Sequence, residues 1–211
     1  MNLIAQLQSL AEGSASRHPG ESQEIMSKGI EELKASHIVS KSLKTGDKIP
    51  AIQLPNQNNE LVDVNEILKT DKVVLSFYRG GWCPYCNLEL KALQHFLPEM
   101  EEKGARLIAI TPETPDNSMT THEKNELTFD ILTDKNNELA RAMNLVFTLP
   151  EDLQGLYKKF GIDLDGTQGN ASQELPLAAT YVIGKNGIIE YHFIEEDYKL
   201  RADPKEILDT L

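Results

Sequence analysis

The 211-residue chain has 33 acidic and 21 basic side chains, which gives a formal net charge of −12 at pH 7. A surface of this charge repels nucleic acid and anionic membranes, so neither is expected as a partner. The sequence has no apolar run of the ~20 residues that a membrane helix needs, and it does not start with a secretory signal. One close pair of cysteines suits a reducing compartment, so a cytoplasmic protein is expected.

Residues 1–43 are predicted to be an N-terminal helical extension. One apolar stripe begins at Leu3 and reaches Leu10, and residues 13–20 are expected to end this first helix because glycines stand at both ends of that stretch. A second helix is predicted over residues 21–36. The extension could be an arm for dimerisation or regulation, but the favoured interpretation is two helices that cover apolar surface of the main domain.

Residues 44–211 are predicted to form an α/β domain with a central mixed sheet flanked by helices. A turn at 45–47, a short strand at 51–54, a hairpin loop at 55–59 and a returning strand from Leu61 come first. The apolar residues 73–77 predict a buried strand, and a helix from Pro84 to about Lys103 follows, with Pro98 expected to kink or shorten it.

The second half of this domain alternates strands and helices. Strands are expected at 105–110 and 129–132 and helices at 116–124 and from Asp134 to Met143, a rhythm typical of parallel strands with crossover helices. A helix at 153–160, an exposed loop at 161–174, a hairpin of strands 180–183 and 188–194, and a last helix from Pro204 complete the chain. Parallel strands followed by an antiparallel hairpin, with a cysteine pair after the central strand, indicate a thioredoxin-like fold.

The chemistry is expected at Trp82-Cys83-Pro84-Tyr85-Cys86, which holds the only two cysteines. Pro84 suits the first position of a helix, so Cys83 is predicted at the N-cap and Cys86 one turn inside. The positive end of the helix dipole can lower a cysteine pKa from about 8.5 to between roughly 3.5 and 7.5. Two such thiols can form a short disulfide, and Arg79 could stabilise a thiolate or an oxyanion. The pattern predicts a redox site.

Metal and cluster sites fit the sequence less well. Structural zinc and iron–sulfur sites need four ligands, whereas this chain has one cysteine pair and five histidines without ligand spacing (His18, His37, His95, His122 and His192). No metal and no cofactor is therefore expected.

The domain resembles the alkyl hydroperoxide reductase/thiol-specific antioxidant (AhpC/TSA) family, the peroxiredoxins. Five segments are similar to it: residues 46–50, 75–86, 108–113, 131–134 and 181–187. The resemblance implies a peroxiredoxin-type fold, a peroxide or small disulfide as substrate, a thioredoxin-like reductant and a possible homodimer.

The same resemblance assigns site residues. In the family pattern Pro-x-x-x-Thr-x-x-Cys, Cys86 takes the position of the cysteine that attacks peroxide, Cys83 replaces the threonine and Arg79 replaces the proline. Glu89 matches an acidic residue that often follows that cysteine. The second family arginine is absent because Ala178 occupies its place, and Arg201 is a candidate substitute.

Two mechanisms use this pair. A thiol peroxidase would form a sulfenic acid on one cysteine and a Cys83–Cys86 disulfide with the other. A thioredoxin- or glutaredoxin-like thiol–disulfide oxidoreductase would instead attack disulfides with Cys83, and proteins of that kind have a cis-proline, for which Pro176 is the nearest candidate. A non-enzymatic redox sensor is the third possibility. The peroxidase is favoured, with Cys86 attacking peroxide, although the mouth of the helix favours Cys83 as the more exposed thiol.

The neighbouring residues carry smaller expectations. Trp82 could shield the pair or dock a partner, and Tyr85 could donate a hydrogen bond to a thiolate or simply pack in the core. Glu89 is expected to complement the helix dipole. Thr111 and Glu113 follow the C-terminal end of a parallel strand, where sites of α/β proteins gather, but a helix cap is the favoured interpretation.

Overall fold

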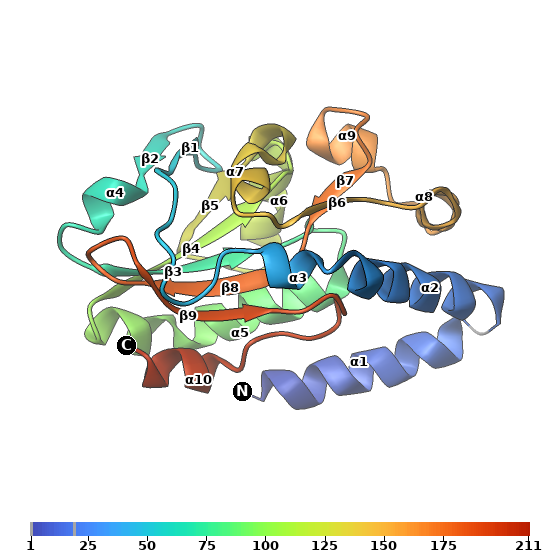
Figure 1. Ribbon diagram of the computed structural model, residues 1–211, viewed down its shortest axis with the longest axis horizontal. Coiled ribbons are helices and arrows are strands. Elements are labelled where there is room, and N and C mark those ends of the chain that lie inside the picture. The colour runs from blue at the N-terminus through green and yellow to red at the C-terminus, as the bar shows by residue number, and fades with distance from the viewer. Residues whose placement is uncertain (1, 19) are drawn as a thin grey trace.

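The computed structural model describes residues 2–18 and 20–211, and its centre is a five-stranded mixed sheet (Figure 1). The strand order is β5-β4-β3-β8-β9. Its members are β3 (Lys72–Phe77), β4 (Ala105–Thr111), β5 (Asp130–Thr133), β8 (Ala179–Ile183) and β9 (Ile189–Ile194). β3, β4 and β5 run parallel, whereas β8 and β9 form an antiparallel hairpin beside β3. The predicted thioredoxin-like arrangement of a mixed sheet is confirmed.

Side chains of the central strand β3 alternate between two apolar cores. Val73, Leu75 and Phe77 face one core, and Val74 and Tyr78 face the other, all of them 0% exposed. A strand buried on both faces explains why residues 73–77 are almost continuously apolar.

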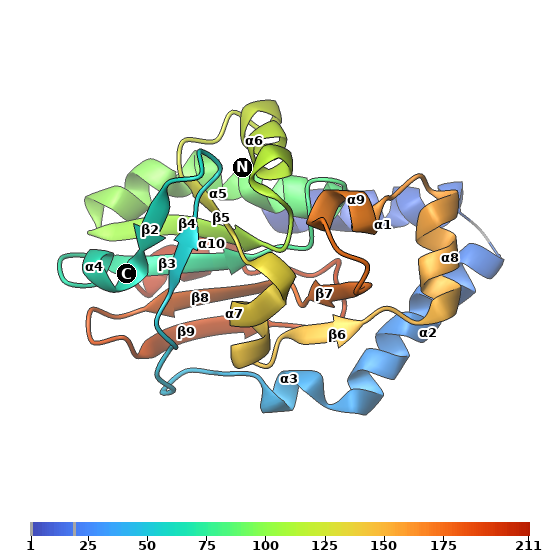
Figure 2. The same ribbon diagram turned by 90° about the horizontal axis from the view of Figure 1, so that it is seen from above.

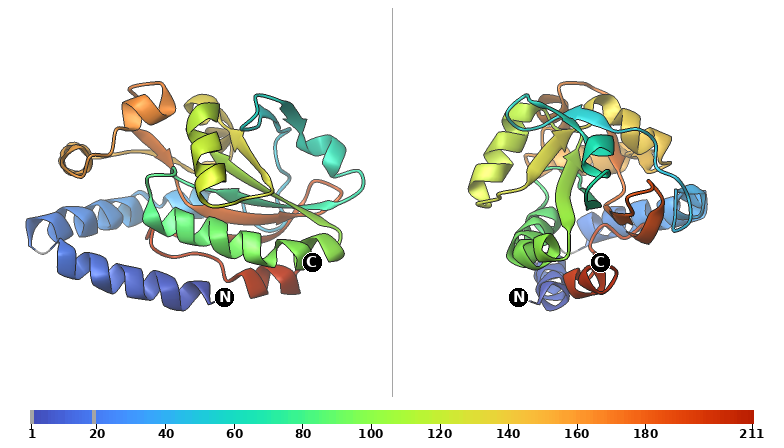
Figure 3. Two further views of the ribbon diagram at one scale, coloured as in Figure 1. Left: turned by 180° about the vertical axis from the view of Figure 1, so that it is seen from behind. Right: turned by 90° about the vertical axis from the view of Figure 1, so that its left-hand side faces the viewer.

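Helices cover both faces of the sheet. The core that contains Val74 and Tyr78 also contains residues of α1 (Leu3–Arg17), α5 (Pro84–Glu102) and α10 (Pro204–Asp209), which lie together below the sheet in Figure 3. The core that contains Val73, Leu75 and Phe77 also contains residues of α3 (Ile38–Lys41), α4 (Val64–Ile67) and α7 (Glu138–Ala142). The redox helix α5 therefore packs between the sheet and the N-terminal helix α1.

The remaining elements flank this sandwich. They are α2 (Glu21–Ser36), α6 (Pro115–Lys124), the 3-10 helix η1 (Lys135–Asn137), α8 (Glu151–Lys159) and α9 (Leu164–Gln168). Two small antiparallel sheets also flank it, β1 (Gln53–Pro55) with β2 (Leu61–Asp63) and β6 (Val146–Thr148) with β7 (Glu174–Pro176); α8 and α9 connect β6 to β7. α2 packs beside α8 at one end of the molecule (Figure 2). Both helices of the extension thus contact the rest of the chain, and a boundary at residue 43 stays a prediction.

Three local predictions are wrong. α1 continues through Gly13 to Arg17, because Leu3 and Leu7 anchor it in the core; Pro19, in the expected break, lies outside the described residues. α5 continues through Pro98, which faces solvent, so this proline does not shorten the helix; a kink there stays a prediction. The expected loop 161–174 contains α9, which the Asp163 side chain caps by accepting from the Gly166 N–H and which ends at Gly169 with a φ of 68°.

Two further observations bear on function. None of the helices in the described part of the chain is both long and apolar enough to cross a membrane. Every peptide bond between described residues is trans, so Pro176 is not the cis-proline expected for the oxidoreductase alternative.

Candidate redox site

The cysteine pair lies where β3 passes into α5. Cys83 is the N-cap of α5, Pro84 is its first residue and Cys86 lies one turn inside, as predicted. Both thiols are free, and they are 1% and 0% exposed. Both thiols are thus buried, and Cys83 is only marginally the more exposed of the two.

The turn before Cys83 requires glycine. Gly80 has a φ of +152°, and a Cβ atom there would overlap the Trp82 indole and approach a Glu113 carboxylate oxygen at 2.8 Å. The backbone N–H of Gly81 donates to the other Glu113 oxygen at 2.8 Å. Glu113 is 2% exposed and holds this turn, so the prediction that it caps a helix is wrong. For Thr111 that prediction is also wrong, because its hydroxyl accepts from the Glu113 N–H at 3.4 Å.

Arg201 reaches Cys86 from the segment after β9. Its guanidinium donates to the Cys86 Sγ at 3.2 Å and to the Glu89 carboxylate at 2.5 Å. Arg201 is 3% exposed and Glu89 is 1% exposed. The structure thus brings the candidate Arg201 to the thiol, and Glu89 forms a buried ion pair with Arg201 rather than complementing the helix dipole at the surface.

Arg79 lies on the other side of the pair among three aromatic rings. Its guanidinium carbon is 5.0 Å from the Trp82 ring centroid, 5.7 Å from that of Tyr157 and 4.5 Å from that of Tyr198, within the range of cation–π attraction. It also donates to the Tyr157 hydroxyl. Tyr85 packs edge-on against Tyr198, with ring centroids 5.6 Å apart. Tyr157 and Tyr198 gave no sequence signal, because they join this cluster only through the fold.

The two thiols have opposite pKa shifts. Burial opposes ionisation of Cys83, but a hydrogen bond from the Cys86 thiol and the positive charges of Arg79 and Arg201 lower its pKa to about 6. Burial and the charge on Cys83 raise the pKa of Cys86 well above its usual value. The pair therefore holds one thiolate at neutral pH.

Two buried carboxyl groups near the cysteine pair, Glu89 and Glu113, have raised pKa values. Burial raises the pKa of Glu89 to about 7, although Arg201 opposes the shift. Burial also raises the pKa of Glu113 to about 7, against the hydrogen bond from Gly81. Both carboxyl groups therefore change charge near neutral pH.

A small cavity of about 150 Å³ leads to Cys83. Cys83, and not Cys86, lines it, together with Arg79, Trp82, Tyr157 and residues of α1. Within the described residues no group of three or more His, Cys, Asp or Glu side chains is placed to hold a metal ion. The arrangement provides a shielded thiolate, a partner thiol one turn away and two guanidinium groups.

Comparison with known proteins identifies the family. Residues 45–192 match the AhpC/TSA family. The chain belongs to the AhpC/TSA family. It is 29% identical over 169 residues to a peroxiredoxin bcp of Haemophilus influenzae, covering 80% of this chain and 96% of that protein. It is 25% identical over 128 residues to peroxiredoxin Bcp of Escherichia coli K12, covering 59% and 81%.

A solved structure agrees on the fold. The Mycobacterium tuberculosis peroxidoxin BcpB superposes with a TM-score of 0.62 at 19% identity, over 80% of this chain and 96% of that one. The expected resemblance to peroxiredoxins is therefore confirmed, and membership of the family makes this chain an oxidoreductase of the thiol-dependent peroxidase class. The match starts at residue 45, so it leaves out α1, α2 and α3.

Proposed function

We propose that this chain reduces peroxides through a sulfenic acid–disulfide cycle carried by Cys83 and Cys86. The supporting observation is a shielded thiol of lowered pKa, Cys83, with a second thiol one helical turn away and two guanidinium groups beside the pair. The substrates are hydrogen peroxide or organic hydroperoxides. A thioredoxin-like dithiol returns the pair to the reduced state.

The first step breaks the peroxide O–O bond. The Cys83 thiolate attacks the terminal oxygen and becomes a sulfenic acid, and the leaving alkoxide or hydroxide takes up a proton. Arg79 lines the same cavity and stabilises the negative charge that develops on the leaving oxygen. The positive charge of Arg201, which donates to the Cys86 sulfur, also stabilises the Cys83 thiolate.

The second step joins the two cysteines. The Cys86 thiol attacks the Cys83 sulfenic sulfur, an S–S bond forms, and the hydroxyl leaves as water with the Cys86 proton. A dithiol reductant then attacks this disulfide, gives up two electrons and is itself oxidised. A homodimer and a cytoplasmic location, where such reductants keep thiols reduced, belong to the same proposal.

The roles of the cysteines are the finer part of the proposal. The family position favours Cys86 as the attacking residue, whereas access from the cavity and the lowered pKa favour Cys83. We therefore assign the attack to Cys83. Trapping with dimedone tests this: the Cys86→Ser variant is expected to carry the adduct on Cys83 after one equivalent of peroxide. An adduct found only in Cys83→Ser would reverse the assignment.

The second candidate, thiol–disulfide exchange, is favoured by Cys83 at a helix N-cap with a lowered pKa. Stopped-flow fluorescence separates the two, because the only tryptophan, Trp82, adjoins Cys83. We expect peroxide to oxidise the reduced protein far faster than it oxidises a free thiol. Oxidation at the rate of a free thiol, together with rapid reduction of insulin disulfides, would instead make it a disulfide oxidoreductase.

A further inference from the structure

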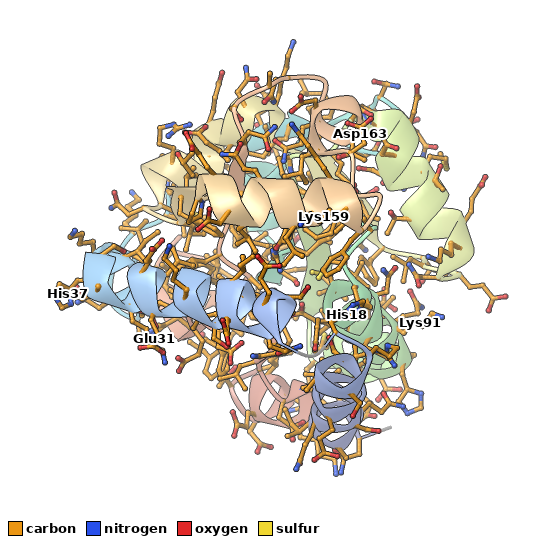
Figure 4. The ribbon with its side chains drawn as sticks, turned by 90° about the vertical axis from the view of Figure 1, so that its right-hand side faces the viewer. His18, Glu31, His37, Lys91, Lys159 and Asp163 are labelled. Atoms are coloured by element: carbon orange, nitrogen blue, oxygen red, sulfur yellow. The ribbon has the colours of Figure 1, made fainter. Side chains whose placement is uncertain are left out.

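A second cavity of about 450 Å³ lies beside the redox site and is not needed for the cycle above. Its walls come from α2, from the β6–β7 sheet and the residues after β7, and from α8, and they include Met26, Ile30, Leu33, Phe147 and Leu177. Figure 4 views the molecule from the side on which α8, with Lys159 labelled, lies above α2, with Glu31 labelled. The volume is in the range of about 300–1,000 Å³ that is typical of ligand pockets.

Arg79 is the only buried charged residue that lines this cavity. The other charged lining residues are partly or fully exposed and of both signs (Glu32, Lys41, Arg141, Glu195 and Glu196), so they do not select an ion of either charge. Arg79 is 3% exposed, and its Nε–H has no hydrogen-bond partner. Among the described residues no carboxylate pairs with Arg79; the groups that act on its charge are two tyrosines and the two cysteines.

A buried cation without a carboxylate partner is unusual, since burying an unpaired charge costs free energy. Arg201 shows the ordinary solution in the same protein, because Glu89 pairs with it. At Arg79 the Cys83 thiolate supplies counter-charge and the aromatic rings cover the guanidinium faces, but the Nε–H stays without a partner. Because Arg79 lines the cavity, a ligand bound there can accept from this guanidinium. A guanidinium at an apolar cavity suits an acid with an apolar tail.

We propose that this cavity binds a linear amphiphilic carboxylic acid, with its carboxylate on Arg79 and its tail against the apolar side chains of α2 and the β6–β7 sheet. Arg79, Tyr157, Tyr198 and Met26 line both this cavity and the one at Cys83, so the head group lies next to the redox site. The α2 wall comes from outside the residues that match the family, so the site belongs to this chain's own extension.

Calorimetric titration of the reduced protein with octanoate, decanoate and 1-decanol tests the proposal without any peroxide. We expect saturable binding of decanoate, about fifteenfold tighter than octanoate, since each of its two additional buried methylenes is worth roughly fourfold in affinity. Arg79→Gln should weaken the affinity for decanoate by about tenfold or more and change the affinity for 1-decanol by less than about threefold, because only the carboxylate pairs with the charge of Arg79.

The matched control is Arg141→Gln, which removes an exposed arginine of the same cavity that already pairs with Glu174 and should leave decanoate affinity unchanged. A second variant, Leu33→Trp, narrows the cavity from α2 without touching Arg79 and should weaken both ligands. The proposal is overturned if decanoate does not saturate, or if Arg79→Gln, folded by circular dichroism, binds it as the wild type does. Because no turnover is measured, these outcomes are independent of the peroxidase proposal.

Discussion

Arg79 and Arg201 flank the cysteine pair with different partners. Arg201 is neutralised by Glu89, whereas Arg79 is held by aromatic rings and a tyrosine hydroxyl. A buried charge that loses its partner costs about 3–5 kcal/mol. The charge state of Glu89 therefore determines how much positive potential reaches Cys86.

Substitutions in the buried ion pair are expected to affect thiol ionisation to different extents. Arg201→Met removes a positive charge that lowers the pKa of Cys83 and should raise that pKa by about one unit. Glu89→Gln should change it little, because Glu89, with a pKa of about 7, is mostly protonated at the pH where Cys83 ionises. The pH dependence of iodoacetamide alkylation measures both. Equal shifts in the two variants would mean that distortion of the site, and not charge, controls the thiols.

Glu113 is expected to make stability depend on pH. Its carboxyl loses its proton near pH 4.5 when unfolded and near pH 7 when folded, so between these values the folded state binds more protons and stability falls as pH rises. Glu113→Gln removes this dependence. The free energy of unfolding of the variant, relative to wild type, should rise by up to about 3 kcal/mol between pH 4.5 and 8.

Urea unfolding at both pH values provides the measurement. Glu126→Gln is a matched control because it makes the same substitution at an exposed glutamate. A constant difference between Glu113→Gln and wild type at all pH values would show that Glu113 keeps an ordinary pKa in the folded protein.

The chemistry-bearing residues divide into those that sequence reasoning could find and those that it could not. Cys83, Pro84 and Cys86 were predictable because the N-cap, the first helical position and the first turn are local features. Glu113, Tyr157 and Tyr198 were not, since they reach the site from other elements through space. The reach of Arg201 was proposed only by family resemblance, and its contact with Cys86 needed the folded chain.

Among helices and strands, the length of an element decides whether the sequence predicts it. The long strands and helices of the sheet were predictable because their apolar periodicity is sustained over many residues. Strands β6 and β7 have three residues each and α9 has five residues, too few to show an apolar periodicity. The persistence of α1 beyond Gly13 depends on its tertiary contacts with α5, which local propensity cannot show.

The docking of α1 on α5 gives a stability prediction. Leu7 is 4% exposed in the core that contains α5, whereas Ile4, one turn earlier, is 43% exposed. Leu7→Ala should lower the free energy of unfolding by about 2–4 kcal/mol, and the control Ile4→Ala by less than about 0.5 kcal/mol. Urea denaturation measures both. Equal, small losses would mean that α1 is not part of the cooperative unit.

At the scale of the whole molecule, the helices of the N-terminal extension pack directly against the domain that matches the family. α1 covers α5 on one side of the sheet, and α2 packs on α8 at the end where the two cavities lie (Figure 2). Residues from both parts line both cavities. Access to the redox site therefore depends on helices that a comparison with the family alone leaves out.

In the proposed cycle, the placement of both cysteines in one helical turn also protects the protein against its own substrate. A Cys83 sulfenic acid has two competing fates: capture by Cys86 or attack on a second peroxide, which gives an irreversible sulfinic acid. Capture needs no second molecule, whereas the second peroxide has to enter a cavity of about 150 Å³. In excess peroxide, mass spectrometry should find the disulfide in wild type and sulfinic acid at Cys83 in Cys86→Ser. Equal overoxidation of both proteins would show that Cys86 gives no protection. If only Cys86→Ser is overoxidised, disulfide formation within the chain is faster than the reaction of the sulfenic acid with a second peroxide.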